Sequence, residues 1–332
     1  MLALKRITAV FVLGVALCAG LFAENIFDNY FEGDTLNRQI RAYITNVSNL
    51  IPDSTTLQNV WSFAPRNRGG YFGFGFNGSI TLLERKLASR IIEGAQGFGG
   101  SLNDLSRFPE SIPFLPGMAF DFRGGSAYFD VGITGMLVDE TTMEDNLGTT
   151  FLGENSQYSF RSLGLDFRYT FIRDGQSVIF KFRVPGIFVP ALTVQGGYNF
   201  TWMGFGIASG QTEKVSVDFR NDSVFIALQA TKKLPIFLTP YFGMKMIFSK
   251  TDSVYSWETR RPVMINETPY PEGAIYKSGG NIGEFYTYFQ FYGGFGINFI
   301  FPHIITIGGA YNVVTEHFGI NLSIRLLGGA GA

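Results

Sequence analysis

In the stretch GGYFGFGFNGS, residues 69–79, phenylalanine occupies positions 72, 74 and 76, and glycine or asparagine occupies positions 73, 75 and 77. Successive side chains of a β-strand point to opposite faces of the sheet. The segment therefore predicts a strand that carries its aromatic groups on one face and almost no side chain on the other.

The same alternation recurs along the chain after residue 70. In SLGLDFRYTFIR, residues 162–173, the apolar side chains fall on odd positions up to 171, and small or charged ones fall on even positions up to 170. Each such segment predicts a strand, and 177–184 and 213–219 are the weakest of them. The expected strands are 71–82, 117–123, 126–137, 158–173, 177–184, 191–205, 213–219, 223–231, 238–249, 285–299, 304–314 and 317–327.

Alternation alone would also fit a soluble β-sandwich. However, many of these strands reach about ten residues, longer than the globular mode of about 5–6. Their apolar face is rich in Phe, Tyr, Leu and Ile, which is more aromatic surface than one soluble core would need. We therefore predict an all-β fold, a closed antiparallel transmembrane β-barrel of about 12 strands over 69–328, with 10 to 14 strands possible.

Composition supports this class. The chain is 46% hydrophobic and 16% aromatic, yet no stretch after the N-terminal segment stays apolar for a helical crossing. Glycine, at 41 of 332 residues, is about twice as frequent as the usual share of roughly 7%. The net charge of −1 and pI of about 6.2 give no reason to expect a nucleic-acid partner.

The N-terminus has the pattern of a secretory signal. Two basic residues at positions 5 and 6 precede an apolar run, 7–19, which is shorter than the roughly 20 residues of a membrane-spanning helix. We expect residues 1–23 to be a signal peptide cleaved after Ala23, with Gly20 as the alternative site. The mature chain is then expected in the outer membrane of a diderm bacterium.

Cys18, the only cysteine, lies within this segment. It is either the acylated residue of a lipoprotein signal or one more small apolar side chain; Leu17 before it argues against acylation. A mature chain without a thiol contains no disulfide and no thiolate chemistry.

The segment 24–68 differs from the rest of the chain because its apolar residues recur at helical spacing behind two N-capping residues. They predict one amphipathic helix that ends at Pro52. It is either a periplasmic helix packed on another element or a plug in the barrel mouth. The residues concerned are Asp34, Thr35, Leu36, Ile40, Ile44, Val47 and Ile51.

Two groups of residues are candidates for ligand binding. If the barrel begins at the periplasm, the connections 83–116, 138–157 and 250–284 are external, and the first is apolar where an exposed loop should be polar. The second group occupies the alternate strand positions whose side chains face the lumen. Its charges either contact a ligand head group or pair with each other as internal struts. The first group comprises Leu87, Ile91, Phe98, Phe108 and Phe114, and the second Arg123, Arg168, Lys245, Tyr288 and Tyr292.

An N-terminal helical segment, a long barrel and an apolar external loop after an early strand together resemble the FadL-type outer-membrane transporters of hydrophobic compounds. The resemblance is one of architecture over the whole mature chain. The Asn-Pro-Ala sequence of that family is absent near the mature N-terminus, so no family residue is carried over by position. The resemblance implies passage of a hydrophobic, fatty-acid-like molecule past an N-terminal hatch.

Enzymatic function is not expected. The only histidines, His303 and His317, have no neighbouring residues in a catalytic arrangement, and no cluster has metal-ligand spacing. We expect no cofactor. The leading hypothesis is passage of a hydrophobic or amphipathic small molecule; the alternatives are a closed structural or surface-interaction barrel and a general diffusion porin. Expected partners are outer-membrane lipid, the barrel-assembly machinery and a hydrophobic small molecule.

Overall fold

The structure of the chain is a computed structural model. It describes residues 31–32, 41, 44–45, 48, 51–57, 70–84, 111–126, 128–138, 156–176, 178–179, 182–183, 185–209, 213–234, 238–259, 263–265, 268–269, 275–298, 303–314 and 318–329. The signal peptide 1–23 and its cleavage after Ala23 lie outside these residues and stay a prediction. No helix in the described ranges is long and apolar enough to cross a membrane.

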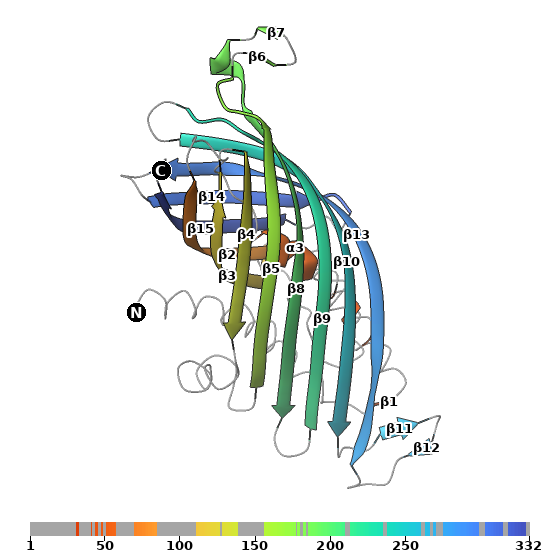
Figure 1. Ribbon diagram of the computed structural model, residues 1–332. Coiled ribbons are helices and arrows are strands. Elements are labelled where there is room, and N and C mark those ends of the chain that lie inside the picture. Colours follow the sequence, from red (N-terminus) through yellow and green to blue (C-terminus); the bar gives the residue numbers. More distant parts are fainter. Residues whose placement is uncertain are drawn as a thin grey trace.

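In the described part of the chain, ten antiparallel strands close into a barrel (Figure 1). Each strand pairs with the next along the chain, and the last pairs with the first, with Phe318 opposite Leu82, so that the sheet has no edge. The strands are β2 (Tyr71–Glu84), β3 (Ser111–Gly125), β4 (Phe129–Val138), β5 (Ser156–Ile172), β8 (Ala191–Ser209), β9 (Glu213–Thr231), β10 (Leu238–Thr259), β13 (Tyr276–Asn298), β14 (His303–Asn312) and β15 (Phe318–Gly329).

The barrel has ten strands and not the twelve that the sequence predicted, although ten was within the expected range. Segment 177–184 contains only the short strands β6 (Val178–Ile179) and β7 (Phe182–Arg183), which pair with each other outside the barrel. Segments 213–219 and 223–231 are parts of one strand, β9, and are hydrogen-bonded without interruption to β8 and β10.

The physical reason for the second error is a change in which face of β9 is apolar. Outward side chains are apolar at positions 224, 226 and 228 but charged at 218, 220 and 222. In the charged half it is the inward residues, Val217 and Phe219, that are apolar and buried. This reversal looks like a strand break in the sequence, although the pairing with both neighbours continues through it.

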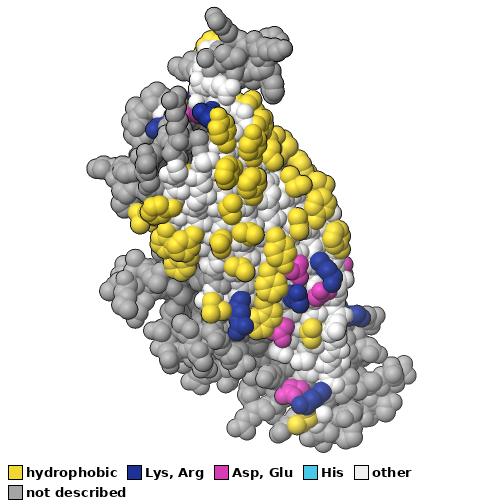
Figure 2. All heavy atoms as spheres, in the orientation of Figure 1, with side chains coloured by type: hydrophobic (Ala, Val, Ile, Leu, Met, Phe, Trp, Pro, Cys, Tyr) yellow, Lys and Arg dark blue, Asp and Glu magenta, His cyan; other side chains and the backbone are white. Residues whose placement is uncertain are grey.

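The outer face of the barrel is apolar over a broad band, to which every barrel strand contributes exposed side chains (Figure 2). Such a surface is stable only against hydrocarbon, and the closed sheet satisfies its own backbone groups. The chain is therefore a transmembrane β-barrel of the outer-membrane type. Its lipid-facing residues include Phe72, Phe122, Ile133, Leu163, Val194, Ile226, Phe242, Phe285, Ile307 and Leu322.

The band ends where outward charges begin on neighbouring strands. Asp222 of β9 lies opposite Lys250 of β10, which lies opposite Phe285 of β13. Beyond this line the outer face carries exposed ion pairs, such as Lys250 with Asp252 at 2.8 Å. We call this the external end. The barrel strands begin and finish at the opposite end, where Tyr71 pairs with Gly329, and bacterial barrels place the ends of the barrel sheet and the short turns in the periplasm.

The long strands on one side of the barrel change the predicted external connections. Strands β10 and β13, of 22 and 23 residues, remain paired up to Thr259 and Tyr276, so most of 250–284 is strand. Similarly, β2 and β3 shorten the connection predicted at 83–116 to 85–110.

Part of the segment 24–68 is described. Strand β1 (Phe31–Glu32) pairs with β11 (Val263–Ile265), which pairs with β12 (Thr268–Pro269). Helix α3 (Ile51–Leu57) follows helical residues at 41, 44–45 and 48. The prediction that the helix ends at Pro52 is wrong, since α3 contains Pro52 and continues to Leu57.

Candidate functional site in the barrel lumen

The strand alternation that places apolar groups in lipid also places polar groups in the lumen. On β5, for example, Leu163 and Leu165 are exposed outside, whereas Asp166 and Arg168 are buried inside. The inward residues of the described strands thus form a polar wall, and its side chains make the candidate site.

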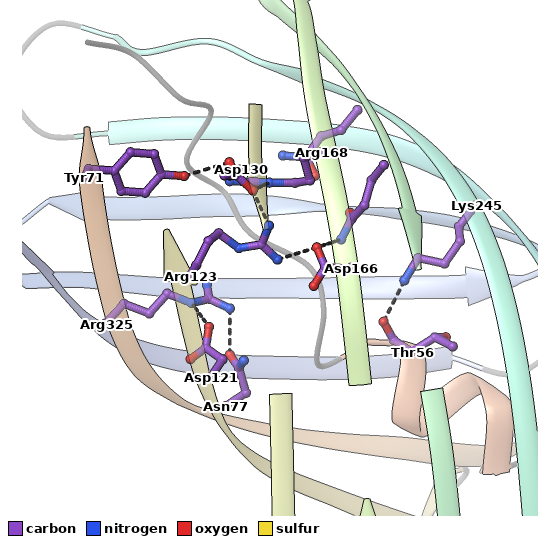
Figure 3. Close-up of polar contacts among 12 residues, drawn as sticks. Thr56, Tyr71, Asn77, Asp121, Arg123, Asp130, Asp166, Arg168, Lys245 and Arg325 are labelled. Carbon is purple, nitrogen blue, oxygen red and sulfur yellow. Dashed lines mark hydrogen bonds and ion pairs between the residues drawn. The ribbon is translucent and has the colours of Figure 1, made fainter. Parts of the chain in front are cut away.

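A buried network of ion pairs covers one part of this wall (Figure 3). Asp130 accepts hydrogen bonds from Arg168 Nε at 2.9 Å, Arg168 Nη2 at 2.7 Å, the Tyr71 hydroxyl at 2.7 Å and the Arg123 guanidinium. Arg123 also donates to Asp166. None of the four charged side chains is more than 2% exposed. The network joins four strands by charge-assisted hydrogen bonds in a region of low dielectric constant.

A second buried pair continues the network towards β15. Arg325 Nε donates to Asp121 Oδ2 at 3.0 Å, and Arg325 Nη2 donates to Asn77 Oδ1 at 2.9 Å. Glycine at the alternate positions that face the lumen makes room for these side chains. A Cβ atom added to Gly132 would lie 2.7 Å from both Arg123 Cζ and Asp166 Oδ2. The glycines on the lumen side of the strands therefore leave room for long charged side chains lying across the wall.

Lys245 lies on the opposite part of the wall, and its side chain is buried. Its ammonium Nζ donates to the backbone carbonyl of Thr56 in α3 at 2.6 Å (Figure 3). The same nitrogen lies 4.8 Å from the centre of the Phe225 ring and 5.4 Å from that of Tyr292, within the range of cation–π interactions. Lys245 is thus a cation on an aromatic surface beneath the N-terminal helix.

The two predicted tyrosines lie beside Lys245. Tyr288 packs in a buried cluster with Phe225 and Ile247. Tyr292 donates from its hydroxyl to Gln229 Oε1 at 3.3 Å. The lumen around Lys245 therefore combines aromatic side chains with two buried amides, Gln229 and Gln290, and Gln290 is the register partner of Lys245.

The N-terminal helical residues lie inside the ring of strands. The hydroxyls of Ser48 and Ser253 are 3.1 Å apart, and the Tyr286 hydroxyl donates to the Thr45 carbonyl at 3.4 Å. Helix α3 contacts both β2 and β9, which face each other across the ten-strand ring. Because Ile44 and Ile51 are also buried, this segment occupies the middle of the lumen.

Towards the external end the inner wall becomes apolar. Its buried residues come from β9, β10 and β13, and most of their outward neighbours are polar or charged, with the exposed Val254 as an apolar exception. They are Val217, Phe219, Tyr255, Trp257 and Ile282.

The predicted residues fall into three groups. Lys245, Tyr288 and Tyr292 lie together, whereas Arg123 and Arg168 lie in the ion-pair network with carboxylates. Leu87, Ile91, Phe98 and Phe108 lie outside the described residues, and Phe114 lies in β3 at an irregularity in its pairing with β2. A role in ligand binding stays a prediction for all of them.

Sequence reasoning missed several participants. Tyr71 occupies the same alternate positions as the glycines that follow it, so its place on the lumen side could have been recognised from the sequence. Phe225 lies within the predicted strand 223–231, but its outward neighbours Val224 and Ile226 are also apolar, so the alternation there did not mark an inward aromatic residue. The Thr56 carbonyl is a backbone group and leaves no signal in the sequence.

Comparison with known proteins gives distant structural likeness alone. No family model and no curated protein matches the chain. The translocator domain of the autotransporter NalP from Neisseria meningitidis matches with 8% identity over 88% of this chain and 98% of that chain, at a TM-score of 0.35. The outer membrane protease OmpT from Escherichia coli matches with 10% identity, 82% and 98% coverage, and a TM-score of 0.36. The toluene transporter TbuX from Ralstonia pickettii matches with 9% identity, 80% and 91% coverage, and a TM-score of 0.22. These scores are low, and the barrel assignment rests on the strand pairing described above.

Proposed function

We propose that this outer-membrane barrel takes up an amphipathic small molecule with an anionic head group and an apolar chain, of the fatty-acid type. The observation that carries the proposal is the position of Lys245. Its buried ammonium lies against Phe225 and Tyr292 and donates to a neutral carbonyl of the N-terminal helix.

A carboxylate accepts a hydrogen bond from an ammonium more strongly than a neutral carbonyl does, because the bond is then assisted by both charges. A ligand carboxylate could therefore replace the Thr56 carbonyl at Lys245. The apolar cluster of Phe225, Ile247 and Tyr288 would take the adjoining part of its chain. In this proposal the N-terminal helix is a hatch that the entering ligand displaces.

The apolar inner wall at the external end supports the same proposal, since it would receive the ligand first. Tyr255 and Trp257 of β10 lie on the inward face of the strand that also carries Lys245. A molecule with an apolar chain would gain about 25 cal/mol for each Å² of apolar surface that it buries there.

A closed structural barrel is the second candidate, and the ion-pair network favours it. Arg123 and Arg168 are paired with Asp130 and Asp166, as expected of internal struts. A general diffusion porin has less support, because a helix occupies the described lumen. Conductance of the refolded protein in planar bilayers separates these cases, since steady conductance of the unmodified chain would indicate a porin.

The test is binding of palmitate to the refolded protein in detergent micelles, measured by isothermal titration calorimetry. Lys245→Met removes the charge and keeps the side-chain length. A hydrogen bond to a charged group contributes about 1.5–3 kcal/mol, so we expect the dissociation constant to rise about 10- to 150-fold. Lys250→Met is the matched control, because Lys250 lies on the outer face of the same strand, and it should leave binding unchanged.

Heat-modifiable migration in gels confirms that both variants are folded. Saturable binding to the parent protein with equal affinity in the two variants would remove Lys245 from the proposal. Absence of saturable binding to the parent protein would overturn the proposal and leave the structural role.

A further inference from the structure

The parallel pairing of β1 with β11 fixes the position of the start of the N-terminal segment. Phe31 lies opposite Val263, and Glu32 lies opposite Met264. Strand β11 begins four residues after Thr259, the last residue of β10, so it lies within about 14 Å of the external end of that strand. Figure 1 shows β1 and β11 together beside the lower ends of β10 and β13.

From there the chain contacts the lumen wall at several depths. Thr45 contacts Tyr286, which is ten residues from the external end of β13. Ser48 contacts Ser253, which is six residues from the external end of β10. Thr56 contacts Lys245, which is fourteen residues from that end. The next barrel element, β2, begins with Tyr71 at the periplasmic end.

The described N-terminal residues therefore lie at the external end at Phe31, in the lumen at Thr45, Ser48 and Thr56, and the barrel begins at the periplasmic end with Tyr71. We infer that the N-terminal segment enters the barrel from its external end and passes through the lumen to the periplasm, so that the residues around Phe31 are presented at the cell surface. A hatch held only from the periplasmic side would place Phe31 at the opposite end. This inference does not depend on the proposed ligand.

Thiol labelling of intact cells tests this inference. Glu32→Cys is introduced into the full chain, and the parent chain serves as the unlabelled control. Val314→Cys marks the external end, because Val314 is 60% exposed after β14. Gln176→Cys marks the periplasmic end, in the exposed turn after β5. A membrane-impermeant maleimide is applied before and after the outer membrane is permeabilised.

We expect Glu32→Cys to be labelled on intact cells to the same fraction as Val314→Cys, whereas Gln176→Cys is labelled only after permeabilisation. Labelling of Glu32→Cys that follows the Gln176→Cys pattern would overturn the inference.

A second measurement covers the case in which the thiol at position 32 is shielded. Glu32 and Met264 are register partners, and paired strands place Cα atoms within the usual 4.4–6.8 Å range of a disulfide. The double variant Glu32→Cys with Met264→Cys should form a disulfide under mild oxidation. If Glu32→Cys is shielded in both cell preparations and this double variant retains two free thiols, the inference is wrong.

Discussion

Replacing Asp130 with asparagine should destabilise the barrel more than any exposed substitution of the same kind. Asp130 is fully buried and accepts from Arg123, Arg168 and Tyr71. Asparagine has nearly the same volume as aspartate but carries no charge. Asp166 is then the remaining carboxylate of the network for two buried guanidinium groups.

The magnitude follows from the burial of both arginines. Removing one partner of a buried ion pair costs about 3–5 kcal/mol, because the remaining charge stays desolvated. This corresponds to about two to three and a half orders of magnitude in the unfolding equilibrium constant. The matched control is Asp252→Asn, where the side chain is 46% exposed and its partner Lys250 is 61% exposed. Its cost should stay below about 1 kcal/mol.

The assay is urea unfolding of the refolded proteins in detergent micelles, followed by tryptophan fluorescence. Free energies of unfolding are extrapolated to zero denaturant for the parent chain and both variants. A difference of less than about 1 kcal/mol between Asp130→Asn and Asp252→Asn would refute the reasoning that the network stabilises the wall.

Two further predictions concern the inner and outer faces of the wall. Gly132→Ala places a methyl group against the Arg123 guanidinium and should cost about 1–3 kcal/mol in the same unfolding assay. Gly78→Ala, on the outer face of β2, is the tolerated control, because its added Cβ has its nearest neighbour at 3.9 Å; equal losses would show that the inner wall has room at Gly132. Leu165→Arg puts a charge on the lipid-facing side of β5, where Leu165 is 53% exposed, and should lower the free energy of unfolding by about 2–4 kcal/mol near the bilayer midplane. Unfolding from lipid vesicles measures this free energy, and an unchanged value would place Leu165 outside the hydrocarbon.

The faces of the strands could be predicted from the sequence because alternation reports them directly. Leu163 and Arg168 of β5 fall on the predicted sides, and they are 58% and 1% exposed. Closure of the barrel followed from the same pattern, since an apolar outer face in lipid requires every backbone group to be paired.

The partners of the lumen charges could not be predicted, because they depend on the order and stagger of the strands. Arg123 and Asp166 are 43 residues apart, and Lys245 and Thr56 are 189 apart. The predicted strand number failed for a related reason. The apolar face of β9 changes sides where the strand leaves the hydrocarbon, and a local pattern cannot distinguish this from a loop.

The measurement that tests the central claim most directly is a disulfide between the N-terminal segment and the inner wall. Ser48→Cys with Ser253→Cys should oxidise completely in the folded protein, since the two hydroxyl oxygens are 3.1 Å apart. Ser48→Cys with Ser256→Cys should stay reduced, because Ser256 lies on the outer face of the same strand. Free thiols are counted with a maleimide polymer after denaturation. Two free thiols in the first pair, or equal cross-linking in both pairs, would contradict the placement of this segment in the lumen.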